Sequence, residues 1–415
     1  MVGSAPPGSA PAVLGGGLPV TLADGRSVDY ANLDYAATAP CMVAAVEAVN
    51  ELLPWYASVH RGAGAASQRC TLAFEQARQT IADFLVARPG DYAIFTRNTT
   101  DALNLLARVA PEHTTVIGWV GEHHANLLPW HKSIRLPVPH SPEAAVQALS
   151  AALAGLRGPV LVTVTGASNV TGEVWPVAEL TAVAHRHGAR IAVDAAQLAP
   201  HRPISLQDSD VDYLTLSGHK IYAPFGAGLL VGRSDWFDAA EPYLAGGGAT
   251  AHVGDAAGDV RWQQGPARHE AGTPNLMGAV AIAAACTSLV AADRVALAAA
   301  EEHLVQRLRA GLDRLPGVAE LRTFAATHDR VGIVSFAVAG MRASEVSAHL
   351  ATRHGIGVRD GLFCAHPLVR RLLARASGRL GRSVGDTAVR ASIGLGSTAE
   401  HVDRLLGGVA ELVGG

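Results

Sequence analysis

The chain has 415 residues, of which 49% are hydrophobic, and a formal net charge of −3 at pH 7. This length is sufficient for two domains, and the hydrophobic content excludes disorder of the whole chain. A net charge so close to zero gives no electrostatic reason to expect a nucleic-acid partner.

The sequence carries no membrane, secretion or disulfide signature. No apolar stretch reaches the length of a membrane span without a charged residue, Gly or Pro, so we expect no membrane partner. The N-terminal stretch lacks a basic start and a continuous apolar run, and we interpret residues 1–30 as a flexible segment rather than a signal peptide. The cysteines form no CxxC pair, which favours a reducing cytoplasm. They are Cys41, Cys70, Cys286 and Cys364.

Apolar, strand-like runs alternate with helical patterns through the middle of the chain. Continuous apolar strands between amphipathic helices are typical of a largely parallel sheet that is buried on both faces. We therefore predict a large α/β domain over residues 31–275. Strands are predicted at Thr115–Trp119, Pro159–Thr165, Arg190–Val193, Val211–Leu216 and Gly228–Val231, and helices at Ser141–Leu153 and Val177–His187.

From about residue 276 the pattern indicates a second, smaller α/β domain, which we expect to occupy residues 276–415. It begins with a long Ala-rich helical region that extends to about Arg314. Strands are then predicted at Gly332–Val338, Gly355–Arg359 and Ala388–Gly394, and helices at Ala343–Arg353 and from Thr398 onward.

Polar residues follow several predicted strands at their carboxyl ends, the edge at which open parallel sheets bind ligands. Asp194 ends a buried strand, where an aspartate is either a helix N-cap or a partner for a ligand cation. Thr99 and Thr100 stand where a helical pattern starts, which fits either N-capping by Thr99 or an anion site. Asn169 and His123 follow two other strands and are further candidates for ligand contact.

Lys220 and Lys132 are the only lysines among 33 Lys and Arg residues. Arginine can serve in salt bridges and phosphate contacts, whereas only a primary amine condenses with a carbonyl. Lys132 fits a chance position on a solvated face. Lys220 lies in the string Ser217-Gly218-His219-Lys220, on a predicted turn between two strands. We therefore expect Lys220 to form a Schiff base with a cofactor, and Asp194 to face a pyridinium nitrogen. No HExxH or comparable spacing indicates a metal.

These strings resemble the class V aminotransferase family, in its cysteine desulfurase and selenocysteine lyase branch. The resemblance covers nearly all of the chain beyond residue 30, and Ser217–Lys220 with the upstream Val193–Gln197 is its most specific part. It implies the pyridoxal-phosphate (PLP) fold type I, with a mostly parallel sheet of the seven-stranded type, and a homodimer with a shared active site. Other matching strings are Leu33–Thr38, His60–Gly62, Thr96–Asn104, Glu122–Asn126, Ser168–Val170, Glu270–Pro274, Arg359, Cys364–Ala365 and Val389–Ser392.

The resemblance also implies roles for single residues around pyridoxal 5′-phosphate. Lys220 would hold the cofactor covalently, Asp194 would keep its ring nitrogen protonated, and His123 would stack on the ring. Gln197 would contact the phenolic oxygen. Phosphate contacts are expected from Thr99, Thr100, Ser217 and His219, and from Thr273 toward the phosphate in the partner subunit. The expected substrate-binding residues are Arg390, which suits a carboxylate, Asn169 and Arg359.

Cys364 matches the position of the persulfide-forming cysteine of desulfurases, although a free cysteine can also be a small buried apolar residue. The chain departs from these relatives at Leu362 and Phe363, where two histidines are common, and at Tyr35, where Asn is usual.

We predict a PLP-dependent C–S lyase, foremost a cysteine desulfurase that acts on a small amino acid and transfers sulfur to an acceptor protein. The alternatives are a β-eliminating C–S lyase on a cysteine conjugate, an aminotransferase or epimerase, and a PLP-binding or sulfur-carrier protein without turnover.

Overall fold

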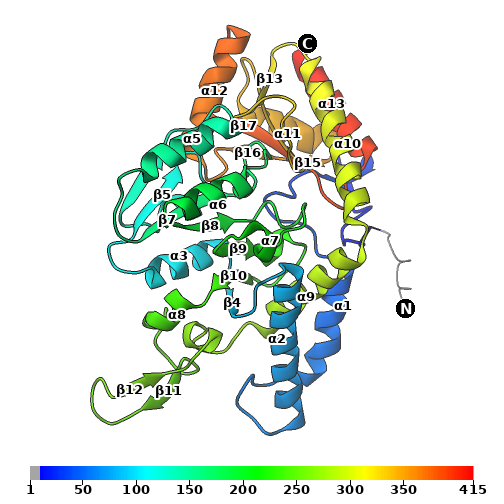
Figure 1. Cartoon of the computed structure of the whole chain (residues 1–415). Coiled ribbons are helices and arrows are strands. Elements are labelled where there is room, and N and C mark those ends of the chain that lie inside the picture. Colours follow the sequence, from blue (N-terminus) through cyan, green and yellow to red (C-terminus); the bar gives the residue numbers. More distant parts are fainter. Residues whose placement is uncertain (1–9, 415) are drawn as a thin grey trace.

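The computed structural model describes residues 10–414 and places the middle of the chain in one central sheet (Figure 1). Its seven strands lie in the order β4-β10-β9-β8-β7-β5-β6. Only β10 runs antiparallel to its neighbours, which confirms the predicted, mostly parallel α/β sheet. The strands are β4 (Asp91–Thr96), β5 (Thr115–Trp119), β6 (Ser133–Leu136), β7 (Val160–Thr165), β8 (Arg190–Asp194), β9 (Tyr213–Ser217) and β10 (Gly228–Arg233).

Helices cover both faces of this sheet, which explains why its strands are apolar throughout. Successive side chains of a strand point to opposite faces. On β7, Leu161 joins the core cluster that includes α3, whereas Val162 joins the cluster that includes α5 and α6. The covering helices are α3 (Thr99–Val109), α5 (Pro142–Leu153) and α6 (Val177–Arg186).

The predicted Ala-rich helical region consists of two helices, α9 (Leu276–Ala291) and α10 (Arg294–Asp313). They are separate because Asp293 caps α10, with its Oδ1 accepting hydrogen bonds from the backbone N–H groups of Val295 (3.1 Å) and Ala296 (2.9 Å). α9 packs against α1 (Val43–Leu52) and α2 (Ala65–Phe84) and contributes Ile282 and Leu289 to the core of the large sheet. Helix α9 therefore packs into the hydrophobic core of the central sheet, which is formed by residues that precede α9 in the chain.

The rest of the C-terminal part forms a four-stranded sheet in the order β13-β14-β17-β16, packed against helices. The predicted strand Gly355–Arg359 is in fact two short strands in different sheets, because β15 pairs with β3 and β16 pairs with β17. The elements are β3 (Ala31–Asn32), β13 (Val318–Leu321), β14 (Ile333–Val338), α11 (Ala343–His354), β15 (Ile356–Gly357), β16 (Arg359–Gly361), α12 (His366–Leu380), β17 (Ala388–Ser392) and α13 (Ala399–Val413).

Of the N-terminal segment predicted to be flexible, residues 1–9 lie outside the described residues, and β1 (Pro19–Thr21) pairs with β2 (Ser27–Asp29). The division of the chain at residue 275 stays a prediction. Within residues 10–414, no helix combines the length and apolar character needed to cross a membrane.

A hairpin of β11 (Thr250–Val253) and β12 (Val260–Trp262) extends from the body in Figure 1. The short helices are α4 (His124–Leu127), α7 (Leu206–Ser209) and α8 (Asp235–Ala239), with 3-10 turns at Leu53–Trp55, Gly218–Lys220 and Pro266–His269.

Candidate active site

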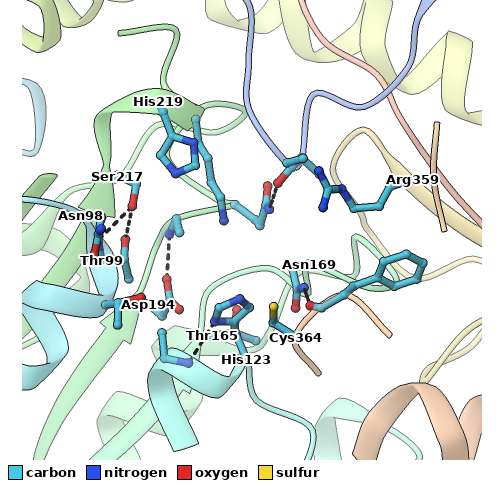
Figure 2. Close-up of a pocket in the computed structure, with 18 of the residues that line it drawn as sticks. Asn98, Thr99, His123, Thr165, Asn169, Asp194, Ser217, His219, Arg359 and Cys364 are labelled. Atoms are coloured by element: carbon cyan, nitrogen blue, oxygen red, sulfur yellow. Dashed lines mark hydrogen bonds between the residues drawn. The ribbon is translucent and has the colours of Figure 1, made fainter. Parts of the chain in front are cut away.

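A cavity of about 300 Å³ opens at the carboxyl edge of the central sheet (Figure 2). Five strands, β4, β5, β7, β8 and β9, deliver side chains to it from the residues at or just after their ends. The cavity brings together nearly all of the residues singled out from the sequence. They are Thr99, Thr100, His123, Asn169, Asp194, Gln197, Ser217, His219, Lys220, Arg359, Cys364 and Arg390.

Lys220 ends the 3-10 turn that connects β9 to β10, as predicted for a turn between strands. Burial lowers the pKa of its amine to about 8, and the nearby Arg390 guanidinium acts in the same direction, while Asp194 and Cys364 oppose the shift. An amine with a pKa of about 8 is neutral in about a tenth of the molecules at pH 7 and in about half of them at pH 8. The neutral amine is the form that attacks a carbonyl.

Asp194 is the last residue of β8 and is almost completely buried. Its Oδ1 accepts a hydrogen bond from the backbone N–H of Ala196 (3.0 Å) rather than capping a helix. Burial raises the pKa of this carboxyl, and the charge of Lys220 opposes that shift. A buried carboxylate without a strong ion-pair partner is poised to receive a cation from a ligand.

Glu122 is a neighbouring buried acid whose role the sequence did not suggest. Its carboxylate accepts hydrogen bonds from the side chain of Asn126 (2.9 Å) and from the backbone N–H of Thr165 (3.1 Å). Burial raises the pKa of Glu122 to about 8, and the charge of Asp194 adds to the shift. The only sequence feature that pointed to Glu122 was the matching string Glu122–Asn126, of which it is the first residue.

His123 precedes α4 and presents a neutral ring to the cavity. Its Nδ1 accepts a hydrogen bond from the backbone N–H of Ala125 (3.0 Å), so the ring proton is assigned to Nε2. Burial lowers the pKa of His123 to about 4, and the nearby Lys220, His124 and Arg390 contribute. The imidazole is therefore uncharged at neutral pH.

The start of α3 forms the wall of the cavity that lies across from Arg359 in Figure 2. Thr99 and Ser217 meet at this wall. Ser217 Oγ accepts a hydrogen bond from the backbone N–H of Thr99 (2.8 Å) and donates to Thr99 Oγ1 (2.9 Å). The predicted alternative that Thr99 is the N-cap is wrong. Asn98 is the cap, with its side-chain oxygen accepting from the backbone N–H of Asp101 (3.0 Å). Thr99 and Thr100 consequently stand in the first turn, where the positive end of the helix favours an anion.

Arg390 lies on β17 and is buried under the aromatic ring of Phe363, whose centroid is 5.0 Å from the guanidinium carbon. One Nη donates to the backbone carbonyl of Asn169 (3.0 Å), and the other faces Asp34 Oδ1 (3.3 Å). Its Nε has no hydrogen-bond partner among the described residues. Burial lowers the pKa of Arg390 to about 10, so the guanidinium stays charged near neutral pH and has donor capacity left for a carboxylate.

Asp34 and Phe363 are the residues that the sequence did not single out for this part of the site. Asp34 also pairs through Oδ2 with Arg359 Nε (3.2 Å), so one carboxylate positions both predicted substrate-binding arginines. Its signal was the string Leu33–Thr38, which follows a short strand. Phe363 was noted only as a departure from related sequences.

Cys364 is exposed and is held on a backbone in the left-handed region, with φ of 52° at Cys364 and 49° at Phe363. Non-glycine residues adopt this conformation only when their surroundings enforce it. Two hydrogen bonds do so: Asn169 Nδ2 donates to the carbonyl of Phe363 (2.7 Å), and the backbone N–H of His124 donates to the carbonyl of Cys364 (2.7 Å). The thiol is thereby presented to the cavity near His123 and Asn169 (Figure 2).

Of the other predicted residues, Gln197 and His219 lie in the cavity and contact the segment that follows β3, whereas Thr273 lies elsewhere. Gln197 Nε2 donates to the carbonyl of Ala36 (2.8 Å), and His219 Nδ1 lies 3.0 Å from Thr38 Oγ1. Burial lowers the pKa of His219 to about 4. Thr273 does not line this cavity but lies in a second one, of about 700 Å³, together with Arg61.

Comparison with known proteins places this geometry in a family. The family described as Aminotransferase class-V matches residues 31–405, which is most of the chain. The chain belongs to the class V aminotransferase family. A cysteine desulfurase of Klebsiella pneumoniae (strain 342) is 34% identical over 405 residues, which cover 94% of each chain. A cysteine desulfurase of Escherichia coli (strain K12 / DH10B) is 31% identical over 95% of this chain and 96% of its own.

Two solved structures of the family resemble the whole molecule. The apo structure of a cysteine desulfurase from Thermococcus onnurineus NA1 has a TM-score of 0.81 and 32% identity, and the match covers 93% of this chain and 95% of that one. A cysteine desulfurase from Escherichia coli in an S-sulfonic acid form has a TM-score of 0.78 and 31% identity, with 92% and 95% of the two chains covered. These matches confirm the predicted family and fold class.

Proposed function

We propose that this protein is a PLP-dependent cysteine desulfurase, which converts L-cysteine to alanine and carries the sulfur away as a persulfide on Cys364. The observation that supports this most is the juxtaposition in one cavity of a buried lysine amine, a buried aspartate and an exposed thiol. The relatives with the same overall length and fold are cysteine desulfurases.

The residues of the cavity fit pyridoxal 5′-phosphate. Among residues 10–414, no ion-pair partner lies within hydrogen-bonding distance of the buried carboxyl of Asp194, which therefore suits a protonated pyridine nitrogen. The first turn of α3, with Thr99, Thr100 and Ser217, suits a phosphate, and His219 lies at the same end of the cavity. Lys220 would hold the cofactor covalently, the neutral ring of His123 would stack on it, and Gln197 would contact its phenolic oxygen. When bound, the cofactor supplies an electron sink that stabilises negative charge developing on the substrate.

The remaining side chains orient the substrate and move protons. Arg390, held by Asp34 and Asn169, would bind the substrate carboxylate through its spare donor capacity, and Arg359 stands beside it. The amine of Lys220, once displaced by the substrate amine, has a pKa suited to taking a proton from the substrate α-carbon and returning one.

Sulfur transfer to Cys364 balances without any further reactant. The Cys364 thiolate attacks the substrate sulfur, a sulfur–sulfur bond forms, and the substrate Cβ–S bond breaks with its electron pair left on the carbon. That carbon then takes up a proton, so L-cysteine and a thiol become alanine and a persulfide. The hydrogen bonds from Asn169 and His124 to the loop would hold the thiol at the cavity for this attack.

The assembly and the surroundings of the enzyme belong to the same proposal. A homodimer would place Thr273 near the phosphate of the partner subunit, and this fits the position of Thr273 in a second cavity away from Lys220. The exposure of Cys364 would let an acceptor protein collect the sulfur, and the free state of all four cysteines fits a reducing cytoplasm.

Product analysis with L-cysteine tests this function. The PLP-loaded enzyme is incubated with L-cysteine and a reducing thiol, and alanine, sulfide, pyruvate and ammonia are measured. We expect alanine and sulfide in equal amounts. Pyruvate and ammonia in place of alanine would identify a β-eliminating lyase, and transfer of the amino group to a keto acid would identify an aminotransferase.

A further inference from the structure

Two histidines and a glutamate converge on one point between α11 and α13, in the C-terminal part of the molecule. The Nε2 atoms of His349 and His354 lie 3.3 Å apart. Glu411 Oε2 lies 3.1 Å from the His354 Nε2 and 3.4 Å from the His349 Nε2. The three residues do not line the cavity that holds Lys220.

These separations match one face of a metal tetrahedron. Zinc binds imidazole nitrogen and carboxylate oxygen at about 2.0–2.2 Å, usually in tetrahedral geometry, which sets neighbouring ligand atoms about 3.3–3.5 Å apart. The three observed separations lie within about 0.2 Å of that range. An ion at the centre of the triangle would therefore need little rearrangement of the side chains.

Hydrogen bonds alone cannot pair all three of these ligand atoms favourably. A carboxylate is only an acceptor, and a neutral imidazole carries one proton. If both Nε2 atoms donate to Glu411, the two N–H groups face each other across 3.3 Å, and if only one donates, a nitrogen lone pair faces the carboxylate. A cation accepts lone pairs from all three atoms at once.

The neighbouring helix provides room for one of the two imidazoles. A Cβ at Gly408 on α13 would lie 2.8 Å from Cδ2 and 3.1 Å from Nε2 of His354. The adjacent Gly407 faces open space, because a Cβ there would meet no atom within 4 Å. Leu350 Cδ2 would also lie 2.8 Å from a Cβ at Gly408, so this glycine leaves room for both Leu350 and His354 of α11.

We propose that His349, His354 and Glu411 form a binding site for a divalent zinc ion that fastens α13 to α11. The side chains of His349 and His354 are mostly buried, with 22% and 15% exposure, whereas that of Glu411 is 60% exposed. The fourth coordination position is consequently open to water. The sequence shows no metal motif because Glu411 lies on another helix, 57 residues from His354, and the two histidines, five residues apart, do not have the HExxH spacing.

Zinc titration of the full-length holoenzyme tests this site. The protein is produced without a polyhistidine tag, freed of metal with a chelator, and titrated with zinc chloride by calorimetry. We expect one equivalent that is present in the wild type and lost in His349→Ala and His354→Ala. Because an ion that binds only the folded state stabilises it, zinc should also raise the melting temperature of the wild type by a few degrees and leave that of these variants unchanged.

Matched variants separate this site from zinc bound elsewhere. Glu411→Gln keeps an oxygen ligand without the charge and should bind zinc more weakly. Gly408→Ala should weaken binding because it displaces His354, whereas Gly407→Ala and His303→Ala, an exposed histidine on α10, should bind as the wild type does. A zinc equivalent that persists in His349→Ala and His354→Ala would assign the metal to other ligands and overturn the proposal, as would a wild type that binds no zinc.

Discussion

Burial sets the protonation states of the residues that would do the chemistry. Lys220, Asp194, Glu122 and His123 all have pKa values shifted first by burial and only then by neighbouring charges. Burial disfavours the charged form, so it lowers the pKa of the amine and the imidazole and raises that of the two acids. The same cause thus prepares a nucleophilic amine and a neutral ring side by side.

The pKa of Lys220 predicts the pH dependence of cofactor uptake. Below pH 8 most of the amine is protonated and unreactive, so the rate of reconstitution of the apoprotein with PLP should rise about tenfold per pH unit and level off above pH 8. Absorbance of the lysine-bound cofactor follows the reaction. Lys220→Ala should give no borohydride-trapped adduct and Lys132→Ala a normal one. The midpoint should persist in Glu122→Gln, because Glu122 also has a pKa of about 8. A midpoint lost in that variant would assign the titration to Glu122.

Asp194→Ala should remove the charge that, in the proposed function, would keep the ring nitrogen of PLP protonated. We expect kcat/KM for L-cysteine to fall by several orders of magnitude, or about 3–5 kcal/mol of transition-state stabilisation, because the group acts in a buried site. The measurement is steady-state alanine release at a cofactor occupancy confirmed by absorbance. Turnover close to that of the wild type, with cofactor bound, would show that Asp194 does not have this role.

Single residues were predictable from the sequence when chemistry demanded an unusual residue type. Lys220 stood out because arginine had replaced nearly every other lysine, and the strand-end residues followed from the rule for parallel sheets. Asp34 and Glu122 were missed as site residues because their partners, Arg390 and Thr165, are distant in the sequence. Phe363 could not be placed on Arg390, since the contact depends on a left-handed loop conformation.

At the scale of elements, the cavity depends on the close approach of β10 to the start of α3. Gly228, the first residue of β10, leaves no room for a side chain: a Cβ there would lie 2.6 Å from the Cα of Asn98 and 2.8 Å from the carbonyl oxygen of Leu216. Both contacts are with backbone, which cannot rotate away. The glycine therefore lets the cap of α3 lie beside β10, the strand that follows Lys220.

Gly228→Ala should push the start of α3 away from β9 and β10. We expect a loss of about 1–3 kcal/mol in the free energy of unfolding, the usual cost of overpacking, together with weaker binding of PLP. Chemical denaturation and fluorescence titration of the apoprotein with PLP measure the two effects. Gly378→Ala on α12, where a Cβ meets no described atom within 4 Å, is the matched control. It should bind PLP as the wild type does and gain up to about 1 kcal/mol in the free energy of unfolding, because alanine favours a helix interior more than glycine does. Equal behaviour of the two variants would contradict this account of the approach.

Most elements of the central sheet were predictable because a strand buried on both faces is a continuous apolar run. The predictions for β5, β7, β8, β9 and β10 agree with the structure to within about two residues. The short strands β15 and β16 were predicted as one, since two or three residues carry too little periodicity to reveal a change of sheet.

At the scale of the whole molecule, a buried glutamate links the two parts of the chain. Glu173 follows β7 and is fully buried. It accepts hydrogen bonds from the backbone N–H groups of Thr323 (3.0 Å) and Phe324 (2.8 Å), which follow β13. Thr171 Oγ1 donates to the same carboxylate (2.7 Å). The edge of the central sheet is thereby fixed to the C-terminal sheet, which carries Arg390.

Glu173→Gln should loosen this link, because an amide NH₂ would replace one acceptor opposite backbone donors. Leaving a buried donor unsatisfied costs about 1–3 kcal/mol, so the melting temperature should fall by several degrees. Differential scanning calorimetry measures the change, with Glu47→Gln at an exposed position on α1 as the control. An unchanged melting temperature would show that Glu173 contributes little to joining the two parts.

The central claim is that Cys364 receives the sulfur, and Cys364→Ala tests it most directly. The variant is loaded with PLP, its absorbance is compared with that of the wild type, and alanine release from L-cysteine is measured together with persulfide labelling of the protein. We expect an unchanged cofactor spectrum, a persulfide on residue 364 of the wild type only, and loss of at least about 99% of alanine release, because no other described thiol lines the cavity. Full alanine release by the variant would contradict the account.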